Sequence, residues 1–147
     1  MILTPHILVG AAIGLKIKNP WLGFLAGLIS HLILDAIPHR EYGQEDSGKK
    51  IKAMRFSTIL KVLLDISIGF GLIYSVYVIK PFIINFWAIA GVILPDIISG
   101  LSWQFPNKFF TVLTKFHLFH AKKFDGKFGI IIQVFVSAIA LYFICQR

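Results

Sequence analysis

The sequence has almost no cysteine and little negative charge. Its single cysteine, Cys145, excludes a disulfide framework or a Cys-x-x-Cys metal site within one chain. Only 7 residues are Asp or Glu, against 15 Lys and Arg, and the net charge is +8. The first ten residues have no basic n-region, so we do not expect them to be a cleaved signal peptide.

Long apolar runs make up most of the chain. Hydrophobic residues account for 56% of it and the mean hydropathy is +0.77, too apolar for an ordinary soluble domain. A soluble protein would have to hide several uncharged runs in a very small core. We therefore interpret residues 1–147 as a single membrane-embedded helical domain whose partner is the lipid bilayer. Lys and Arg collect in cytoplasmic loops, so the positive charge does not lead us to expect a nucleic-acid partner.

Five apolar segments can be marked, at roughly 3–15, 20–37, 57–79, 82–101 and 128–145. The last four approach the length of about 20 residues that a transmembrane helix needs, and the first is short. The sequence predicts an all-α polytopic membrane protein with about four to five transmembrane helices. It leaves open whether segment 3–15 spans. Residues 106–124 predict an additional amphipathic helix on the cytoplasmic surface.

Short motifs predict how these helices begin and pack. Thr4-Pro5 predicts an N-cap with a helix beginning at His6. Asn19-Pro20 predicts a turn between the first two segments. Gly10-x-x-x-Gly14 and Gly23-x-x-x-Gly27 permit close helix approach and suggest that these two segments pack as a hairpin.

The basic residues predict the orientation in the membrane. Loops 38–56 and 102–127 hold five Lys and Arg each, ten in all, and the opposite side holds four, namely Lys16, Lys18, Lys80 and Arg147. The positive-inside rule therefore places both long loops in the cytoplasm. The expected location is a bacterial or archaeal inner (plasma) membrane, with the N-terminus cytoplasmic.

Ionisable side chains inside these apolar segments predict a functional site. His31-x-x-x-Asp35-x-x-x-His39 closes the second segment and shares one helix face. Such residues are costly in a bilayer, and their nitrogen and oxygen atoms are typical ligands of divalent metals. The predicted topology brings five further donors to the same cytoplasmic side: His6, Asp65, Asp96, His117 and His120.

Eight donors exceed what one tetrahedral zinc needs and would suit a two-metal centre that activates water for attack on a phosphoryl group. We expect one or two divalent ions, with Zn favoured and Mn or Fe as alternatives. Asp65 and Asp96 are the candidate catalytic carboxylates. Arg40 could hold an anionic substrate.

Each donor also has a structural explanation that spacing leaves open. His31 could hydrogen-bond across helices, and Asp35 and His39 could form an ordinary pair at headgroup depth. Asp65 could pair with Lys61, and Asp96 could cap a helix. His6 could be a polar residue of the first turn, and His117 and His120 could be interfacial. The alternative functions are an ion-binding or transport protein and a non-enzymatic membrane regulator.

The chain contains three motifs of interest: Thr4-Pro5-His6 with Gly10, Gly27-x-x-Ser30-His31-x-x-x-Asp35-x-x-Pro38-His39, and Leu94-Pro95-Asp96. They resemble motifs of the bacterial inner-membrane metal-dependent hydrolases that are described as LexA-binding, inner-membrane-associated hydrolases. That family is distantly similar to zinc-dependent phospholipase C-like proteins. The resemblance implies a helical membrane-bound enzyme that hydrolyses a lipid or lipid-linked phosphoester. Two features depart from the family: the chain is short, and no His-rich segment directly follows Asp96.

Overall fold

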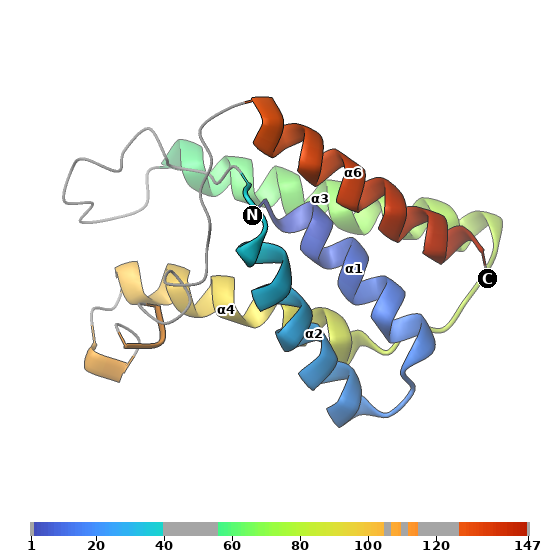
Figure 1. Ribbon diagram of the computed structural model, residues 1–147, viewed down its shortest axis with the longest axis horizontal. Helices are drawn as coiled ribbons and strands as arrows, with labels where there is room; N and C mark the ends of the chain where they lie inside the picture. The colour runs from blue at the N-terminus through green and yellow to red at the C-terminus, as the bar shows by residue number, and fades with distance from the viewer. Residues whose placement is uncertain (1, 40–55, 105–106, 110–111, 115–126, 147) are drawn as a thin grey trace.

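The computed structural model describes residues 2–39, 56–104, 107–109, 112–114 and 127–146 (Figure 1). Its main elements are the helices α1 (Leu3–Lys16), α2 (Pro20–Ala36), α3 (Phe56–Ile79), α4 (Phe86–Gln104) and α6 (Lys127–Cys145). The described residues contain no strand, so the all-α prediction is confirmed for this part of the chain. Residues 108–109 and 112–114 are helical, and the rest of the predicted amphipathic segment, except for residue 107, lies outside the described residues.

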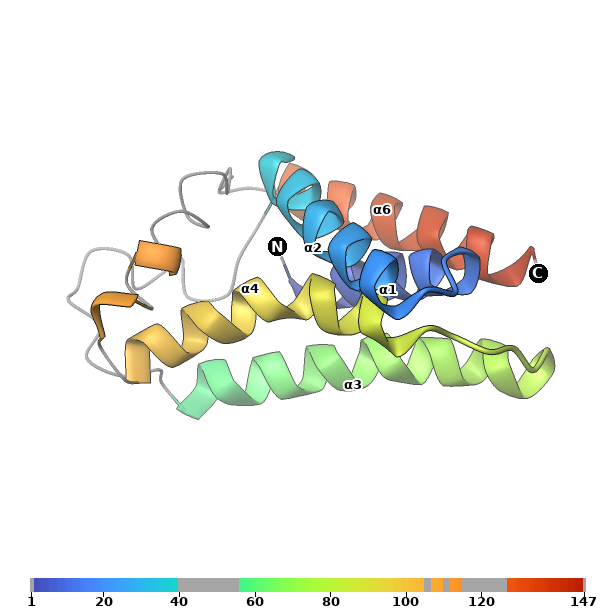
Figure 2. The same cartoon turned by 90° about the horizontal axis from the view of Figure 1, so that it is seen from below.

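Helix α1 is the centre of the fold. It contacts each of the other four helices named above, and it lies between α2, α3 and α6 in the two views of Figures 1 and 2. Ile7, Leu8 and Ala11 are fully buried in the core around it. A helix that is apolar on every side is stable when neighbouring helices cover it, which explains why this short segment is internal.

Glycines bring α1 and α2 close to α4. A Cβ on Gly10 would lie 3.1 Å from the Cα of Ile89, and a Cβ on Gly27 would overlap the carbonyl oxygen of Ala88. The first two helices do contact each other, but the glycines of both predicted motifs face α4 or, for Gly14, the residues just before this helix. Spacing thus identified the close approach but not the partner helix, because the partner depends on the tertiary fold.

The starts of α1 and α2 can be compared with the motifs Thr4-Pro5 and Asn19-Pro20. The sequence predicts a turn at Asn19-Pro20, and Asn19 also caps α2 by accepting a hydrogen bond from the Leu22 amide at 3.1 Å, with Pro20 as the first helical residue. The prediction for α1 is wrong, because this helix begins at Leu3 and not at His6. Thr4 is therefore inside the helix, whose first amides are capped from α3, as described below.

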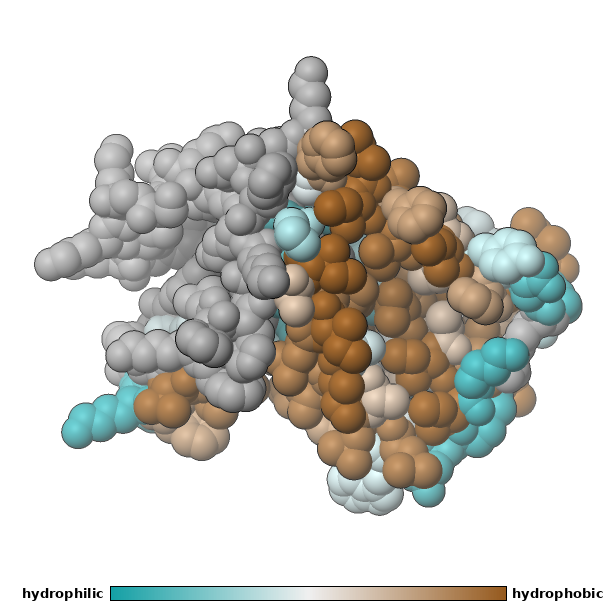
Figure 3. All heavy atoms as spheres, in the orientation of Figure 1, coloured by the Kyte–Doolittle hydropathy of each residue, from teal (hydrophilic) through white to brown (hydrophobic). Residues whose placement is uncertain are grey.

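Within the described residues, two helices are long and apolar enough to cross a membrane: α3, and residues Phe128–Cys145 of α6. Their most apolar windows are only 17% and 22% buried, so most of this apolar surface faces outward. Helices α1 and α2 and residues Phe86–Ser102 of α4 are also apolar but shorter. Hydrophobic residues dominate the described surface in Figure 3, far more than a monomeric soluble protein usually exposes.

Candidate metal centre

One buried face of α2 carries glycines near the start of the helix and ionisable residues near its end. Gly23, Gly27, His31 and Asp35 follow at intervals of four residues and are all buried. The glycines let α2 contact α4 at one end, and the polar residues occupy the same face at the other. His39 continues the interval just after the helix ends and is also buried.

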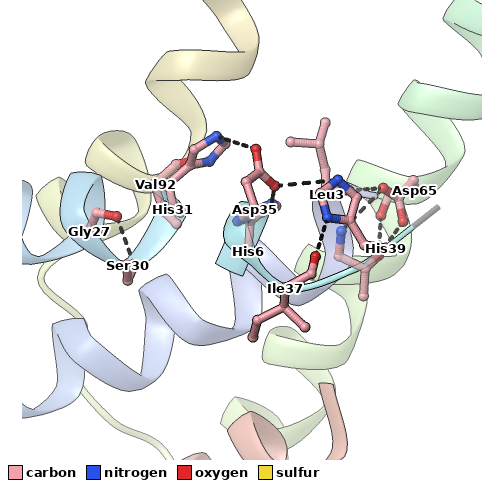
Figure 4. A network of polar contacts seen from close by, with 11 residues as sticks. Leu3, His6, Gly27, Ser30, His31, Asp35, Ile37, His39, Asp65 and Val92 are labelled. Carbon is pink, nitrogen blue, oxygen red and sulfur yellow. Dashed lines mark hydrogen bonds and ion pairs between the residues drawn. The ribbon is translucent and has the colours of Figure 1, made fainter. Parts of the chain in front are cut away.

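The Asp35 carboxylate is surrounded by three imidazole rings (Figure 4). Its Oδ1 atom lies 3.2 Å from Nε2 of His6, and its Oδ2 atom lies 3.2 Å from Nε2 of His31. Nε2 of His39 is 3.8 Å from Oδ1. All four side chains have 0% exposure, so water does not solvate their charges.

Backbone carbonyls set the orientation of two of these rings. Nδ1 of His31 lies 2.7 Å from the Val92 carbonyl oxygen, and Nδ1 of His39 lies 2.7 Å from that of Ile37. A carbonyl can only accept, so each Nδ1 carries a hydrogen and donates it. In a neutral ring, Nε2 then has only a lone pair, and this lone pair faces the carboxylate. Two acceptors repel each other unless a proton or a cation lies between them.

The nitrogen–oxygen contacts of Asp35 are close in length to the separation of two ligand atoms on one metal ion, with His6 and His31 at different oxygens of the carboxylate. Ligands at about 2.0–2.1 Å from a tetrahedral zinc are about 3.3 Å from one another. The contacts of Asp35 with His6 and His31 have this length, and the contact with His39 is slightly longer. Histidine ligands of metals typically donate their second ring hydrogen to a carbonyl or carboxylate, as His31 and His39 do here.

A second carboxylate, Asp96 of α4, lies near the same rings. His6, His31 and Asp96 each offer a ligand atom, and these atoms lie within 4.8 Å of one another. Asp96 is half-buried, whereas the histidines are fully buried. Nδ1 of His6 is buried without a hydrogen-bond partner in the described part of the chain, which leaves a ring nitrogen available near this carboxylate. We refer to His6, His31, Asp35, His39 and Asp96 as the His/Asp cluster.

Asp65 of α3 contacts the first turn of α1, whereas Asp35 contacts the imidazole rings. Its carboxylate accepts hydrogen bonds from the backbone amides of Leu3 and Thr4 and from the Thr4 hydroxyl. These bonds satisfy amides that would be unpaired at the start of α1, and the negative charge lies at the positive end of the helix. In Figure 4 the dashed lines drawn from Asp65 run to the start of α1, and none of them joins it to an imidazole ring. Its metal-ligand role stays a prediction, as does its catalytic role.

The structure thus brings five of the eight predicted donors together, from three helices. Arg40, His117 and His120 lie outside the described residues. Sequence reasoning missed Thr4 as a partner of Asp65 and the Val92 carbonyl as a partner of His31. A backbone carbonyl has no side-chain signature. The nearest sequence signal was Pro95, which lacks an amide hydrogen and so leaves the carbonyl of Gly91, the residue before Val92, without its usual helical partner.

Comparison of the chain with models of protein families, with curated proteins and with solved structures found no match. The resemblance to inner-membrane hydrolases therefore stays a prediction. The described residues define a helical, apolar protein with a largely buried group of His and Asp side chains that could hold a metal ion.

Proposed function

We propose that this protein is a multi-pass membrane metalloenzyme that binds at least one divalent cation in the His/Asp cluster and hydrolyses a phosphoester. One observation carries the proposal. Three imidazole nitrogens converge on the buried Asp35 carboxylate, while the other nitrogen of His31 and of His39 is committed to a backbone carbonyl. A divalent cation bound to these atoms would turn the opposed lone pairs of His31, His39 and Asp35 into favourable contacts and would accept the free pair of more than one ring at once.

The membrane part of the proposal has separate support. Helix α2 has polar residues inside and exposes Trp21, Leu25, Ile29 and Ile33, which is the reverse of a soluble protein. Its 17 residues would extend about 26 Å, near the lower limit for a spanning helix. We propose that α2 and α4 cross the bilayer together with α3 and α6, that α1 is the fifth candidate, and that the N-terminus is cytoplasmic.

The position of the cluster suits chemistry at the membrane boundary. His6 lies in the first turn of α1 and Asp35 in the last turn of α2, so both are near helix ends on the proposed cytoplasmic side. Lipid headgroup phosphates lie at this depth, and a lipid or lipid-linked phosphoester is the proposed substrate class. Arg40 directly follows His39 in the sequence and is the proposed residue for binding its negative charge.

The residues of the His/Asp cluster would have two different roles. A bound Zn, Mn or Fe ion would lower the pKa of water and polarise a phosphoryl oxygen. His6, His31, Asp35 and His39 are fully buried and would hold the ion in a dry environment. Asp96 is half-buried, so it is the carboxylate best placed to accept a proton from an attacking water molecule.

The experiment is hydrolysis of defined phospholipids and lipid-linked phosphates by the purified protein in proteoliposomes. We expect release of phosphate or a phosphorylated headgroup that requires added Zn²⁺, Mn²⁺ or Fe²⁺ and is abolished by a chelator. Asp96→Asn should lower the rate by at least about 100-fold while the protein retains metal, as for loss of a general base. Metal-dependent cation flux without any hydrolysis would contradict the enzyme and favour a transporter that uses the same donors.

A further inference from the structure

In the described part of the chain, the hydrogen bonds of the Asp65 carboxylate lead to the helical turn that carries His6. We propose that Asp65 and Thr4 form an interhelical clamp that positions His6 as a metal ligand. Asp65 is a positioning residue in this proposal, because it acts through α1 and not on the ion. The inference rests on the metal site proposed above.

The clamp consists of several contacts between α3 and α1. The Asp65 carboxylate accepts from the amides of Leu3 and Thr4, the latter at 3.2 Å. The Thr4 hydroxyl lies within hydrogen-bond distance of the carboxylate and 2.9 Å from the Asp65 carbonyl oxygen. Asp65 is 4% exposed, so water competes little for these bonds.

A glycine allows α3 to come close enough to make them. Gly69 lies one turn after Asp65 and faces Ile7 of α1, where an added Cβ would be 3.1 Å from the nearest side-chain atom. Ile73 continues the buried stripe of α3 by another turn. Asp65 therefore approaches α1 from a helix that is already held along it, and not from a free loop.

His6 depends on this clamp because of its position in α1. Leu3 is the first residue of the helix and His6 the fourth, so His6 lies in the turn whose amides lack intrahelical partners. Without a cap, this turn is the part of a helix that frays first. Ile2, the residue at the cap position, provides no side-chain hydrogen bond. Fraying would carry His6 away from its 3.2 Å contact with Asp35.

The test uses substitutions that remove the clamp and leave the cluster residues in place. Thr4→Val keeps the shape of the side chain but loses the hydroxyl, and Thr4→Ser is the matched control that keeps it. Asp65→Asn removes the negative charge at nearly constant size. For each purified protein, Zn²⁺ affinity is measured by competition with a chelating dye, and the number of imidazole ligands by X-ray absorption.

We expect Thr4→Val and Asp65→Asn to weaken Zn²⁺ binding by about 10-fold, in the range seen for residues that support metal ligands, and to lower the imidazole count by one. Thr4→Ser should stay within about twofold of wild type. In a His6→Ala background, Asp65→Asn should cause no further loss of affinity, because the ligand that it positions is already absent.

Unchanged affinity and imidazole count in both Thr4→Val and Asp65→Asn would overturn the clamp, even if thermal stability falls. So would a loss in the His6→Ala background equal to that in wild type. If Asp65→Asn does not fold, Thr4→Val decides. A wild-type protein that binds no Zn²⁺ would overturn the proposed metal site itself, and the clamp with it, which is a result distinct from the other two.

Discussion

The two ends of the contact between α2 and α4 use polar groups in opposite ways. At one end, the Asn85 side chain donates to the carbonyls of Ile17 and Asn19, both at 2.9 Å, and accepts from the Trp87 amide at 3.1 Å. Every donor there has an acceptor. At the other end, imidazole nitrogens and a carboxylate face each other as acceptors. The bonds at the first end pair donors with acceptors, whereas the second end is the proposed site of a cation.

This difference distinguishes polar residues that stabilise the fold from polar residues that we propose bind a cation. Both groups are close to helix ends in an apolar protein, so neither composition nor depth distinguishes them. The distinction comes from the direction of each hydrogen bond. The four predictions that follow test it, from the largest expected effect to the smallest.

Gly27→Val should disrupt both ends, because the new side chain would overlap the Ala88 carbonyl and force α2 away from α4. We expect the free energy of unfolding to fall by about 3 kcal/mol or more, at the upper end for overpacked cores. Thermal unfolding in detergent micelles, followed by circular dichroism, measures this. Gly71→Ala is the control, since a Cβ there meets nothing within 4 Å. Equal melting temperatures for Gly27→Val and wild type would contradict the packing.

Asp35→Asn should disable only the second end. The variant should bind Zn²⁺ at least about 100-fold more weakly, because it loses the carboxylate that the three imidazoles face. Wild type at a free-metal concentration of 100 times Kd should lose about 2.7 kcal/mol of stability when a chelator is added. Asp35→Asn should be insensitive to the chelator. An equal response of the two proteins, measured by thermal unfolding, would show that this carboxylate does not hold a metal.

Asn85→Ala should weaken only the first end. It removes the partners of two carbonyls and one amide, and we expect a loss of about 1–3 kcal/mol of stability. Zn²⁺ affinity should stay within about twofold of wild type, because the substitution touches no residue of the His/Asp cluster. Isothermal titration together with thermal unfolding separates the two effects. A large loss of affinity would mean that the ends are coupled.

His39→Ala should have the smallest effect within the cluster. Its contact with Asp35 is the longest of the three, at 3.8 Å, and it follows the end of α2. We expect Zn²⁺ affinity to fall by about 10-fold, against about 100-fold for His31→Ala, which removes a ring held between Asp35 and Val92. Competition with a chelating dye measures both. A reversed order would mean that His39 is a principal ligand.

Periodicity was enough to predict part of this site. The interval of four residues placed His31 and Asp35 on one face of α2, and the structure shows them in contact. His39 lies near Asp35 too, but α2 ends before this residue, so its position does not come from a shared helix face. The charge of the loops then suggested that His6 and Asp96 lie at the same end, and they do approach His31. These inferences worked because they needed only helix geometry and the order of the segments.

Helix geometry and segment order could not predict which helices contact each other. Thr4-Pro5 resembled a local N-cap, but Asp65, 61 residues away in the sequence, caps the helix instead. The glycine motifs looked like an α1–α2 interface, but they face α4 and the residues just before it. A sequence shows which residues can cap or pack closely. The partner is decided by the tertiary arrangement, which brings one helix end beside another.

Metal analysis of the purified protein tests the central claim most directly. Elemental analysis after purification without chelators, followed by titration of the chelated protein with Zn²⁺, Mn²⁺ and Fe²⁺, should give at least one tightly bound ion per chain. The ion should be lost in Asp35→Asn and His31→Ala and retained in Asn85→Ala. A protein that is purified without metal and does not bind any of the three ions when they are added would contradict the account.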